Sequence, residues 1–159
     1  EPSNVLNPDL KGLFLSLYTE YEECKDKEDV HISKIPLISL MILSNLRFNT
    51  LLGRRNRNIT TIYEKVCNNE IFLFDIKEIR SPFMLPLILQ NNKKRDNLKD
   101  LLLKNNIYPP IHWKIQGLIP EKFGYEHQLS SKILSIPIDQ RYSIEDMVRI
   151  ANVINEARV

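Results

Sequence analysis

Hydrophobic residues recur every three or four positions in the first part of the chain, as one face of a helix requires. This spacing predicts helices at residues 13–21, 33–45 and 48–66. The second helix is apolar on nearly every side, so we expect it to be deeply packed. The third carries Arg55 within its apolar face. The chain is therefore expected to begin with a helical part.

Short apolar runs between polar or proline-containing breaks predict strands after residue 67. We expect strands at residues 71–74, 83–89 and 133–138, and a strand-like segment at 107–113. Pro86 removes one backbone donor from the second of these strands, which indicates an edge strand or a bulge.

Helical spacing returns between and after these strands. A helix is expected to follow a polar break at residues 91–95 and to end near Lys104, and a short helix to occupy 128–132. The closing helix begins at Ser143, which forms an acidic variant of the capping box with Asp146. The apolar face of this helix consists of Ile144, Met147, Val148, Ala151 and Ile154.

The order of these elements predicts an α+β fold, in which N-terminal helices pack on a small, mostly antiparallel sheet with alternating helices. A chain of 159 residues is long enough for one domain with its own core. We expect a single domain over residues 1–159, with a helical part at 1–67 and a mixed strand and helix part at 68–159.

Composition is that of an ordinary soluble globular protein, with 43% hydrophobic and 26% charged residues. The net charge of +2 hides an acidic start, since residues 1–32 contain eight acidic and three basic side chains. The basic excess in the remainder is too diffuse to indicate nucleic-acid binding. With four glycines, the chain has few positions suited to phosphate-binding loops.

Cysteines and histidines give no support to a disulfide framework or a zinc site. Cys24 and Cys67 form no recognisable spacing, which favours a reducing, cytoplasmic location. His31 and His127 have no neighbouring zinc ligands. The sequence shows no apolar run of membrane-spanning length and no secretory signal. It begins without an initiator methionine, which we interpret as the mark of a piece of a longer protein.

The sharpest candidate for a binding site is the end of the segment 107–113. Pro109 and Pro110 fix the backbone and remove two donors, so the residues that follow are held on a stiff arm. His112 can hydrogen-bond a sugar hydroxyl or a phosphate, and Trp113 can stack on a sugar or ring face. In the alternative interpretation Trp113 packs on the core and His112 caps a backbone group.

A second candidate precedes the closing helix. Asp139 and Arg141 are two residues apart there, and an arginine next to a helix N-terminus can bind an anion in a bidentate way. The alternative, which we favour from the residues, is that the two pair with neighbours and fix the corner. Other basic residues are interpreted as solvated or ion-paired: Arg54, Arg55, Arg57 and the run at 93–95.

Five stretches carry a resemblance to a known family. They are Phe48–Asn58, Phe83–Leu89, Lys104–Asn106, Ile107–Trp113 and Leu134–Tyr142. In this order they resemble the C-terminal, small domain of DegT/StrS-type sugar aminotransferases, which are fold-type-I pyridoxal-phosphate enzymes. The resemblance extends over residues 10–156, and Gly53 departs from it by interrupting the long helix. The family's large, cofactor-binding domain has no counterpart in this sequence.

The resemblance implies an enzyme that transfers an amino group to a keto sugar carried on a nucleotide. Pyridoxal phosphate is then bound by a lysine of the missing large domain, so no catalytic or cofactor-binding residue is assigned here. The resemblance places the loop that carries His112 and Trp113 on the substrate side of the active site. We expect these two residues to contact the substrate, with Tyr108 and Arg141 as secondary candidates. The implied partners are the large domain, the nucleotide sugar and a second copy in a homodimer, without nucleic acid or membrane. By itself this segment is expected to bind no cofactor and to be inactive.

Two other classes of function stay open. A stand-alone, non-catalytic interaction module would reuse this fold and present an apolar face to a partner. A nucleic-acid-binding protein would show an affinity that falls steeply with salt concentration. The coding sequence upstream of Glu1 separates the enzyme from the module, because the enzyme requires a large α/β domain there.

Overall fold

The structure, a computed structural model, describes residues 12–13, 16–17, 20 and 34–158. Contacts along the chain divide it into two compact units, residues 1–46 and 47–159. The single domain expected from the sequence stays a prediction. Within the helix expected at 13–21, the described residues are helical, and the others lie outside the described residues.

Helix α2 (Leu37–Ser44) confirms the second expected helix but not its packing. The helix starts after Pro36, whose carbonyl accepts hydrogen bonds from the amides of Ser39 and Leu40 at 3.0 and 3.2 Å. None of its residues is buried, and Leu37 is 73% exposed. A helix that is apolar on every side is buried only where neighbours surround it, and its apolar pattern alone does not show whether such neighbours exist. The expectation of deep packing is therefore wrong for the described chain.

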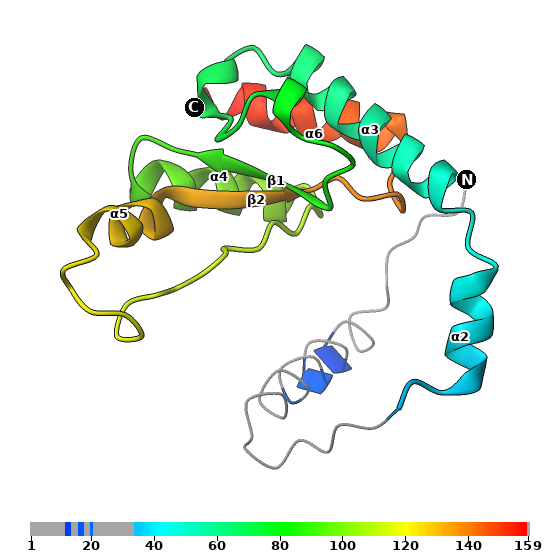
Figure 1. Cartoon of the computed structure of the whole chain (residues 1–159). Helices are drawn as coiled ribbons and strands as arrows, with labels where there is room; N and C mark the ends of the chain where they lie inside the picture. Colours follow the sequence, from blue (N-terminus) through cyan, green and yellow to red (C-terminus); the bar gives the residue numbers. More distant parts are fainter. Residues whose placement is uncertain (1–11, 14–15, 18–19, 21–33, 159) are drawn as a thin grey trace. The chain divides into compact units, whose positions relative to one another are not determined.

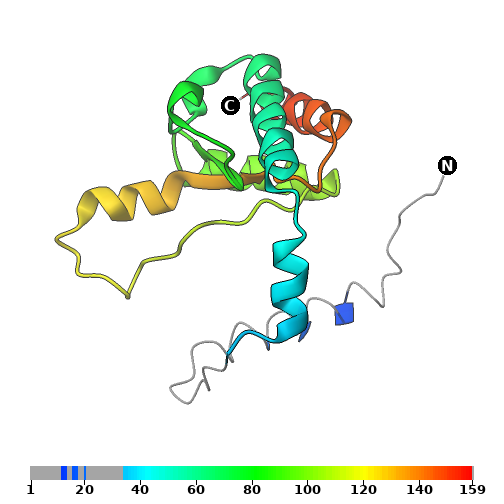
Figure 2. The same cartoon turned by 45° about the vertical axis from the view of Figure 1, so that its right-hand side comes forward.

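The second unit is built on two long helices, α3 (Phe48–Lys65) and α6 (Ile144–Glu156), which lie side by side over a small sheet (Figures 1 and 2). Both helices confirm the sequence prediction. The expected capping box is present at the start of α6, where the Asp146 amide donates to the Ser143 hydroxyl at 3.2 Å. Phe48, in the first turn of α3, is exposed rather than part of the core. The buried side chains of the two helices are Asn58, Ile59, Ile62, Met147, Ile150, Ala151, Val153 and Ile154.

The small sheet consists of two antiparallel strands, β1 (Met84–Ile88) and β2 (Ile133–Pro137). They confirm two of the expected strands, and their register places Pro86 opposite Ser135. Because each strand of a two-stranded sheet is an edge strand, the expected edge position of Pro86 is also confirmed. Its carbonyl accepts a hydrogen bond from the Leu73 amide at 3.3 Å.

The strand expected at residues 71–74 is absent from the described structure. This stretch contributes one isolated bridge, between Phe72 and Leu87, and is flanked by the 3₁₀ turns η1 (Asn69–Ile71) and η2 (Ile76–Glu78). The cause is local side-chain chemistry at the start of each turn. The side chains of the two preceding residues accept hydrogen bonds from the amides two positions ahead, in the pairs Asn68–Glu70 and Asp75–Lys77.

Helix α4 (Asn92–Lys104) begins earlier than the sequence indicated. The Asn91 side chain accepts a hydrogen bond from the Lys94 amide at 2.9 Å and caps the helix. The polar break expected at 91–95 is therefore the cap and first turn of α4. Arg95 is not part of a solvated turn, since its side chain is 13% exposed and its Nε lies 2.8 Å from Asp96.

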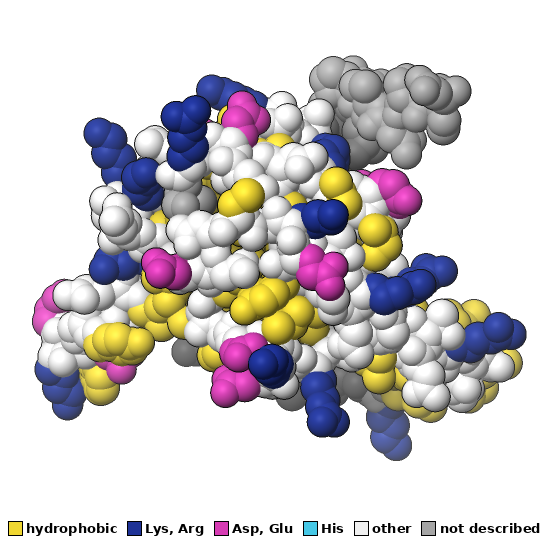
Figure 3. Space-filling view, turned by 90° about the horizontal axis from the view of Figure 1, so that it is seen from above, with side chains coloured by type: hydrophobic (Ala, Val, Ile, Leu, Met, Phe, Trp, Pro, Cys, Tyr) yellow, Lys and Arg dark blue, Asp and Glu magenta, His cyan; other side chains and the backbone are white. Residues whose placement is uncertain are grey.

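The remaining helix, α5 (Gly124–Lys132), starts before the short helix expected at 128–132. Helices α3, α4 and α6 share one hydrophobic core with the antiparallel sheet. The described helices and strands form the expected α+β fold. Lys and Arg side chains are spread over the face seen in Figure 3 rather than gathered in one strip. Among the described residues, no helix combines the length and the apolar character needed to cross a membrane.

Candidate functional site

The corner between β2 and α6, residues 138–142, is built on an ion pair. The Asp139 carboxylate accepts hydrogen bonds from Nε and Nη2 of Arg141, both at 2.8 Å, and from the Arg141 amide at 2.9 Å. Asp139 is fully buried, whereas the Arg141 side chain is 67% exposed. The hydrogen bonds from Arg141 hold the pKa of Asp139 below its usual value, although burial acts in the opposite direction. The structural role favoured from the sequence is therefore present, but Asp139 and Arg141 pair with each other rather than with other neighbours.

A buried amide joins this corner to α3. Asn58 Nδ2 donates to the backbone carbonyls of Ile138, Asp139 and Tyr142, at 3.1, 2.9 and 3.2 Å. Sequence reasoning missed Asn58. The available signal was its position in the apolar stripe of α3, four residues before Ile62, because a polar side chain is buried only where it finds partners.

Arg55 holds the outer side of the same corner. Its Nε donates to Oε1 of Gln140 at 2.6 Å, and its Cζ lies 5.4 Å from the centre of the Phe83 ring. This contact over the ring is a cation–π arrangement. The prediction that Arg55 lies in the seam of its helix is confirmed.

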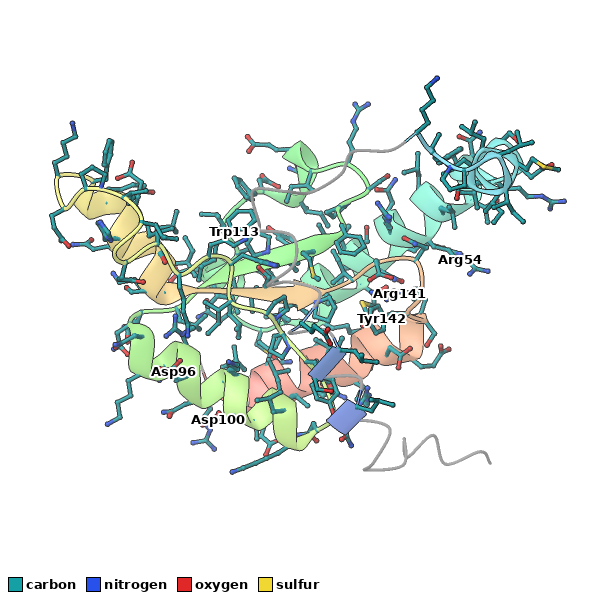
Figure 4. All side chains as sticks on the ribbon, turned by 90° about the horizontal axis from the view of Figure 1, so that it is seen from below. Arg54, Asp96, Asp100, Trp113, Arg141 and Tyr142 are labelled. Atoms are coloured by element: carbon teal, nitrogen blue, oxygen red, sulfur yellow. The ribbon has the colours of Figure 1, made fainter. Side chains whose placement is uncertain are left out.

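A cleft of about 300 Å³ opens beside the corner. Its lining is Arg54, Arg57, Asn58, Gln140, Arg141, Tyr142, Ser143 and Ile144. Figure 4 shows Arg54, Arg141 and Tyr142 at the same end of the second unit. Three of the lining side chains are guanidinium groups and none is acidic. The lining therefore favours an anion over a cation.

The N-terminus of α6 is already occupied by acidic side chains of its own first turn. Asp146 accepts a hydrogen bond from the Ser143 amide at 3.0 Å. The Glu145 carboxylate is held by its own amide and by Ser143, which lower the pKa of this exposed group. These carboxylates meet the partial positive charge of the helix end. An anion in the cleft would therefore depend on the arginines, contrary to the sequence-based expectation that the helix end contributes.

The arm at residues 107–113 runs beside β2 without forming a strand. Pro109 and Pro110 have no amide hydrogen, so they cannot donate to a ladder. The Pro110 carbonyl accepts a hydrogen bond from the Ser135 amide at 3.0 Å and attaches the arm to β2. Ile107 and Pro109 are buried, which fixes the base of the arm.

The tip of the arm carries His112 and Trp113 in different surroundings. His112 Nδ1 lies 3.0 Å from the Ser135 hydroxyl, so the ring is tethered to β2. The Trp113 carbonyl accepts a hydrogen bond from the Ser130 hydroxyl, while the Trp113 side chain is 74% exposed. The alternative in which Trp113 packs on the core is therefore wrong. The partner of His112 is a side-chain hydroxyl rather than the backbone group that the same alternative proposed.

The four predicted site residues do not share one cleft in the described structure. Tyr108, His112 and Trp113 do not line the cleft at Arg141, and Figure 4 shows Trp113 well apart from Arg141. Tyr108 is exposed, like Trp113. Their assignment to a substrate site stays a prediction. Three of the four residues lie on the arm, and Arg141 lies at the corner.

A second cleft, of about 390 Å³, is lined by Asn68, Glu70, Ile71, Ile88, Leu89, Gln90, Lys94, Lys132 and Arg158. This cleft offers two lysines but no aromatic ring, whereas the cleft at Arg141 offers Tyr142 but no lysine. A pyridoxal-phosphate site needs a lysine together with groups that hold the ring and tune its nitrogen. Neither cleft fits the coenzyme by itself. The part of the chain that the structure describes also holds no group of three or more His, Cys, Asp or Glu suited to a metal ion.

Solved structures share this fold over part of their length. The protein Spr1654 of Streptococcus pneumoniae, provisionally assigned as a sugar aminotransferase, is 16% identical, with TM-scores of 0.58 for its PMP-form and PLP-form and 0.57 for its apo-form. The match covers 74% of this chain and 33% of that protein. No family model and no curated protein matches the sequence. The chain is therefore similar in fold to about one third of Spr1654.

Proposed function

We propose that this chain is the C-terminal, small domain of a pyridoxal-phosphate-dependent aminotransferase of DegT/StrS type. The full protein transfers an amino group to a keto sugar carried on a nucleotide. The observation that carries the proposal is the fold shared with Spr1654 over 74% of this chain. Because the match spans only 33% of that protein, a separate large domain is left to hold the coenzyme. Neither of the two clefts described above combines a lysine with an aromatic ring.

In this proposal the arm and the corner form two parts of the substrate wall. Trp113 and Tyr108 expose aromatic faces suited to stacking on a sugar or base ring. His112, tethered to Ser135, is held in position to hydrogen-bond a sugar hydroxyl. Arg141 offers guanidinium donors to an anionic group of the substrate.

The proposed partners are the large domain of the same polypeptide, the nucleotide sugar and a second copy in a homodimer. Exposed apolar side chains of α2 fit a role in packing against the large domain, since such a helix is stable only when covered. We further propose a cytoplasmic location for the full protein.

Activity of the full coding sequence tests the proposal. Expressed with pyridoxal phosphate, the complete protein should convert a nucleotide-linked keto sugar to the amino sugar with an amino-acid donor. Trp113→Ala should lower kcat/KM at least about tenfold through lost stacking, whereas Tyr125→Ala, which removes another exposed aromatic side chain, should change it little. Failure to form any amino sugar from a range of nucleotide keto sugars would contradict the proposal.

The isolated chain should be inactive and should not retain the coenzyme. Mixing it with pyridoxal phosphate and then borohydride should leave no stoichiometric adduct on a lysine. A single lysine modified in full yield would show that this chain carries its own coenzyme site. That result would contradict the proposal that the large domain holds the coenzyme.

A stand-alone interaction module is the second candidate, because the exposed apolar side chains of α2 would serve a foreign partner equally well. The coding sequence upstream of Glu1 discriminates between the two. A large α/β domain encoded there supports the enzyme, and a start codon close to Glu1 supports the module.

A further inference from the structure

We propose that the cleft between α3 and the corner at residues 138–142 is a binding site for a small phosphate-bearing ligand. The inference rests on the role proposed above for Arg141 and extends it, but it concerns binding by this chain itself and is tested without amino transfer. It rests on three guanidinium groups that line one hollow of about 300 Å³, with no acidic side chain in the lining.

Arg54 and Arg57 are the first part of the argument. They are three residues apart on α3 and are therefore neighbours on its surface. Both are exposed, and neither guanidinium makes a hydrogen bond or an ion pair with any described residue. Arg55, between them, is bonded instead to Gln140. Two like charges at this spacing weaken a helix, so an anion between them would remove an unfavourable interaction.

Arg141 is the second part of the argument. Asp139 engages its Nε and Nη2 from the buried side, at 2.8 Å each. A guanidinium has five N–H donors, and this pairing leaves three of them for another acceptor. The group is exposed yet held in one orientation, which lowers the entropy lost when it binds a ligand. Asp139 cancels the charge of Arg141, so Arg54 and Arg57 supply the net positive charge of the cleft.

Rigidity of the cleft floor is the third part. Asn58 is 2% exposed and donates to three carbonyls of the corner, which holds the corner against α3. The backbone positions that carry the arginines of the helix and of the corner therefore keep their spacing. Phosphate oxygens match paired guanidinium donors in geometry and charge. A volume of about 300 Å³ is at the lower end of ligand pockets, so it suits a phosphate or diphosphate with a small attached group.

Calorimetric titration of the full chain with pyrophosphate and with ADP, at fixed ionic strength, tests the proposal. The variant Arg54→Gln with Arg57→Gln changes two exposed side chains, and thermal unfolding checks that it is folded. We expect its affinity to fall at least about tenfold, as the loss of charged hydrogen bonds implies. The matched control is Lys65→Gln with Lys104→Gln, which removes the same charge from exposed ends of α3 and α4 outside the cleft.

The outcomes separate the sources of the phosphate. Equal affinity for ADP and pyrophosphate identifies the phosphate groups as the whole ligand, and tighter binding of ADP identifies a nucleotide; both support the proposal. No measurable binding of either to the unaltered chain overturns it. So does an equal loss of affinity in the two double variants, because the effect would then come from overall charge. Tighter binding of a single-stranded oligonucleotide, weakened alike by both variants, would also overturn it in favour of a diffuse nucleic-acid surface.

Discussion

The corner at residues 138–142 and the arm at residues 107–113 both adjoin β2, but they use polar and aromatic side chains in opposite ways. In the corner the polar groups face inward: Asp139 is fully buried and Asn58 reaches it from α3. In the arm the anchors are two serine hydroxyls, which bond the His112 ring and the Trp113 carbonyl. The large aromatic side chains of the arm face solvent.

The buried polar residues of the corner stabilise the fold. The exposed aromatic residues of the arm have no such role that would explain their presence. Removing a buried, hydrogen-bonded group of the corner leaves its partners unsatisfied inside the protein. Removing the Trp113 ring leaves no buried polar group unsatisfied, since this side chain is 74% exposed. The exposed rings therefore point to a contact with something beyond the described residues, which we propose to be the substrate and the large domain.

The largest expected effect belongs to Asn58→Ala. Three corner carbonyls lose a buried donor, so the free energy of unfolding should fall by about 3 kcal/mol. Urea denaturation measures the change. Asn97→Ala, which alters an exposed amide on α4, is the control and should stay near the unaltered value. Equal stability of the two variants would show that the corner does not depend on this amide.

Next comes Arg141→Ala, which leaves the buried Asp139 carboxylate without its charged partner. Loss of a partner from a buried charge is strongly destabilising, but Arg141 is 67% exposed and water reduces the effect. We expect a loss of about 2 kcal/mol at pH 7. Arg54→Gln, at an exposed arginine of the same cleft, should lower the free energy of unfolding little. An equal loss of stability in the two variants would contradict the claim that Arg141, unlike Arg54, stabilises the fold.

The same ion pair makes a smaller, pH-dependent contribution. The folded pKa of Asp139 is lowered, chiefly by its hydrogen bonds with Arg141. The stabilisation is therefore fully present above the unfolded pKa, near 4, and is lost as the pH falls through the lower folded value. The unfolding free energy should decline between pH 5 and pH 2 by about 1 kcal/mol more in the unaltered chain than in Asp139→Asn. Parallel pH profiles of the two proteins would contradict the assignment.

Ser135→Ala weakens an anchor of the arm. The hydroxyl 3.0 Å from His112 Nδ1 is lost while the backbone bond to Pro110 remains. We expect a cost of about 1 kcal/mol, together with a change in the nuclear magnetic resonance signals of the His112 ring. Ser131→Ala, at the neighbouring helix end, is the control. An unchanged His112 ring in Ser135→Ala would show that another group positions it.

Secondary structure followed from local sequence wherever the deciding interactions were local. The apolar stripe of α3 and the Ser143–Asp146 cap of α6 are read from residues three or four positions apart, and both were predicted. The prediction of a strand at 71–74 was wrong because the side chains of Asn68 and Asp75 accept hydrogen bonds from amides two positions ahead. These local bonds override the apolar pattern. The prediction that α2 is buried was wrong for another reason. The spacing of hydrophobic residues shows which face of a helix is apolar, but not what covers that face.

The candidate site was only partly predictable, because its bonds join distant parts of the chain. A structural role for Asp139 and Arg141 at this corner was expected, and their pairing with each other lies within three residues. Asn58 reaches carbonyls about 80 positions away, so the sequence could indicate only a polar residue in an apolar stripe. The cleft could not be predicted for the same reason, because Arg54 and Arg57 of α3 are far in sequence from the corner residues that line it with them.

Trp113 is the single tryptophan of this sequence, so in this chain fluorescence quenching by acrylamide reports on the arm tip alone. The quenching is measured first on this chain and then on the full-length protein with nucleotide sugar bound, in which every tryptophan outside this sequence is replaced by phenylalanine, so that it compares the exposed arm tip with the proposed assembled site. We predict ready quenching in the isolated chain and strong protection in the full-length complex. Equal quenching in both would contradict the claim that the arm presents its aromatic side chains to the rest of the enzyme.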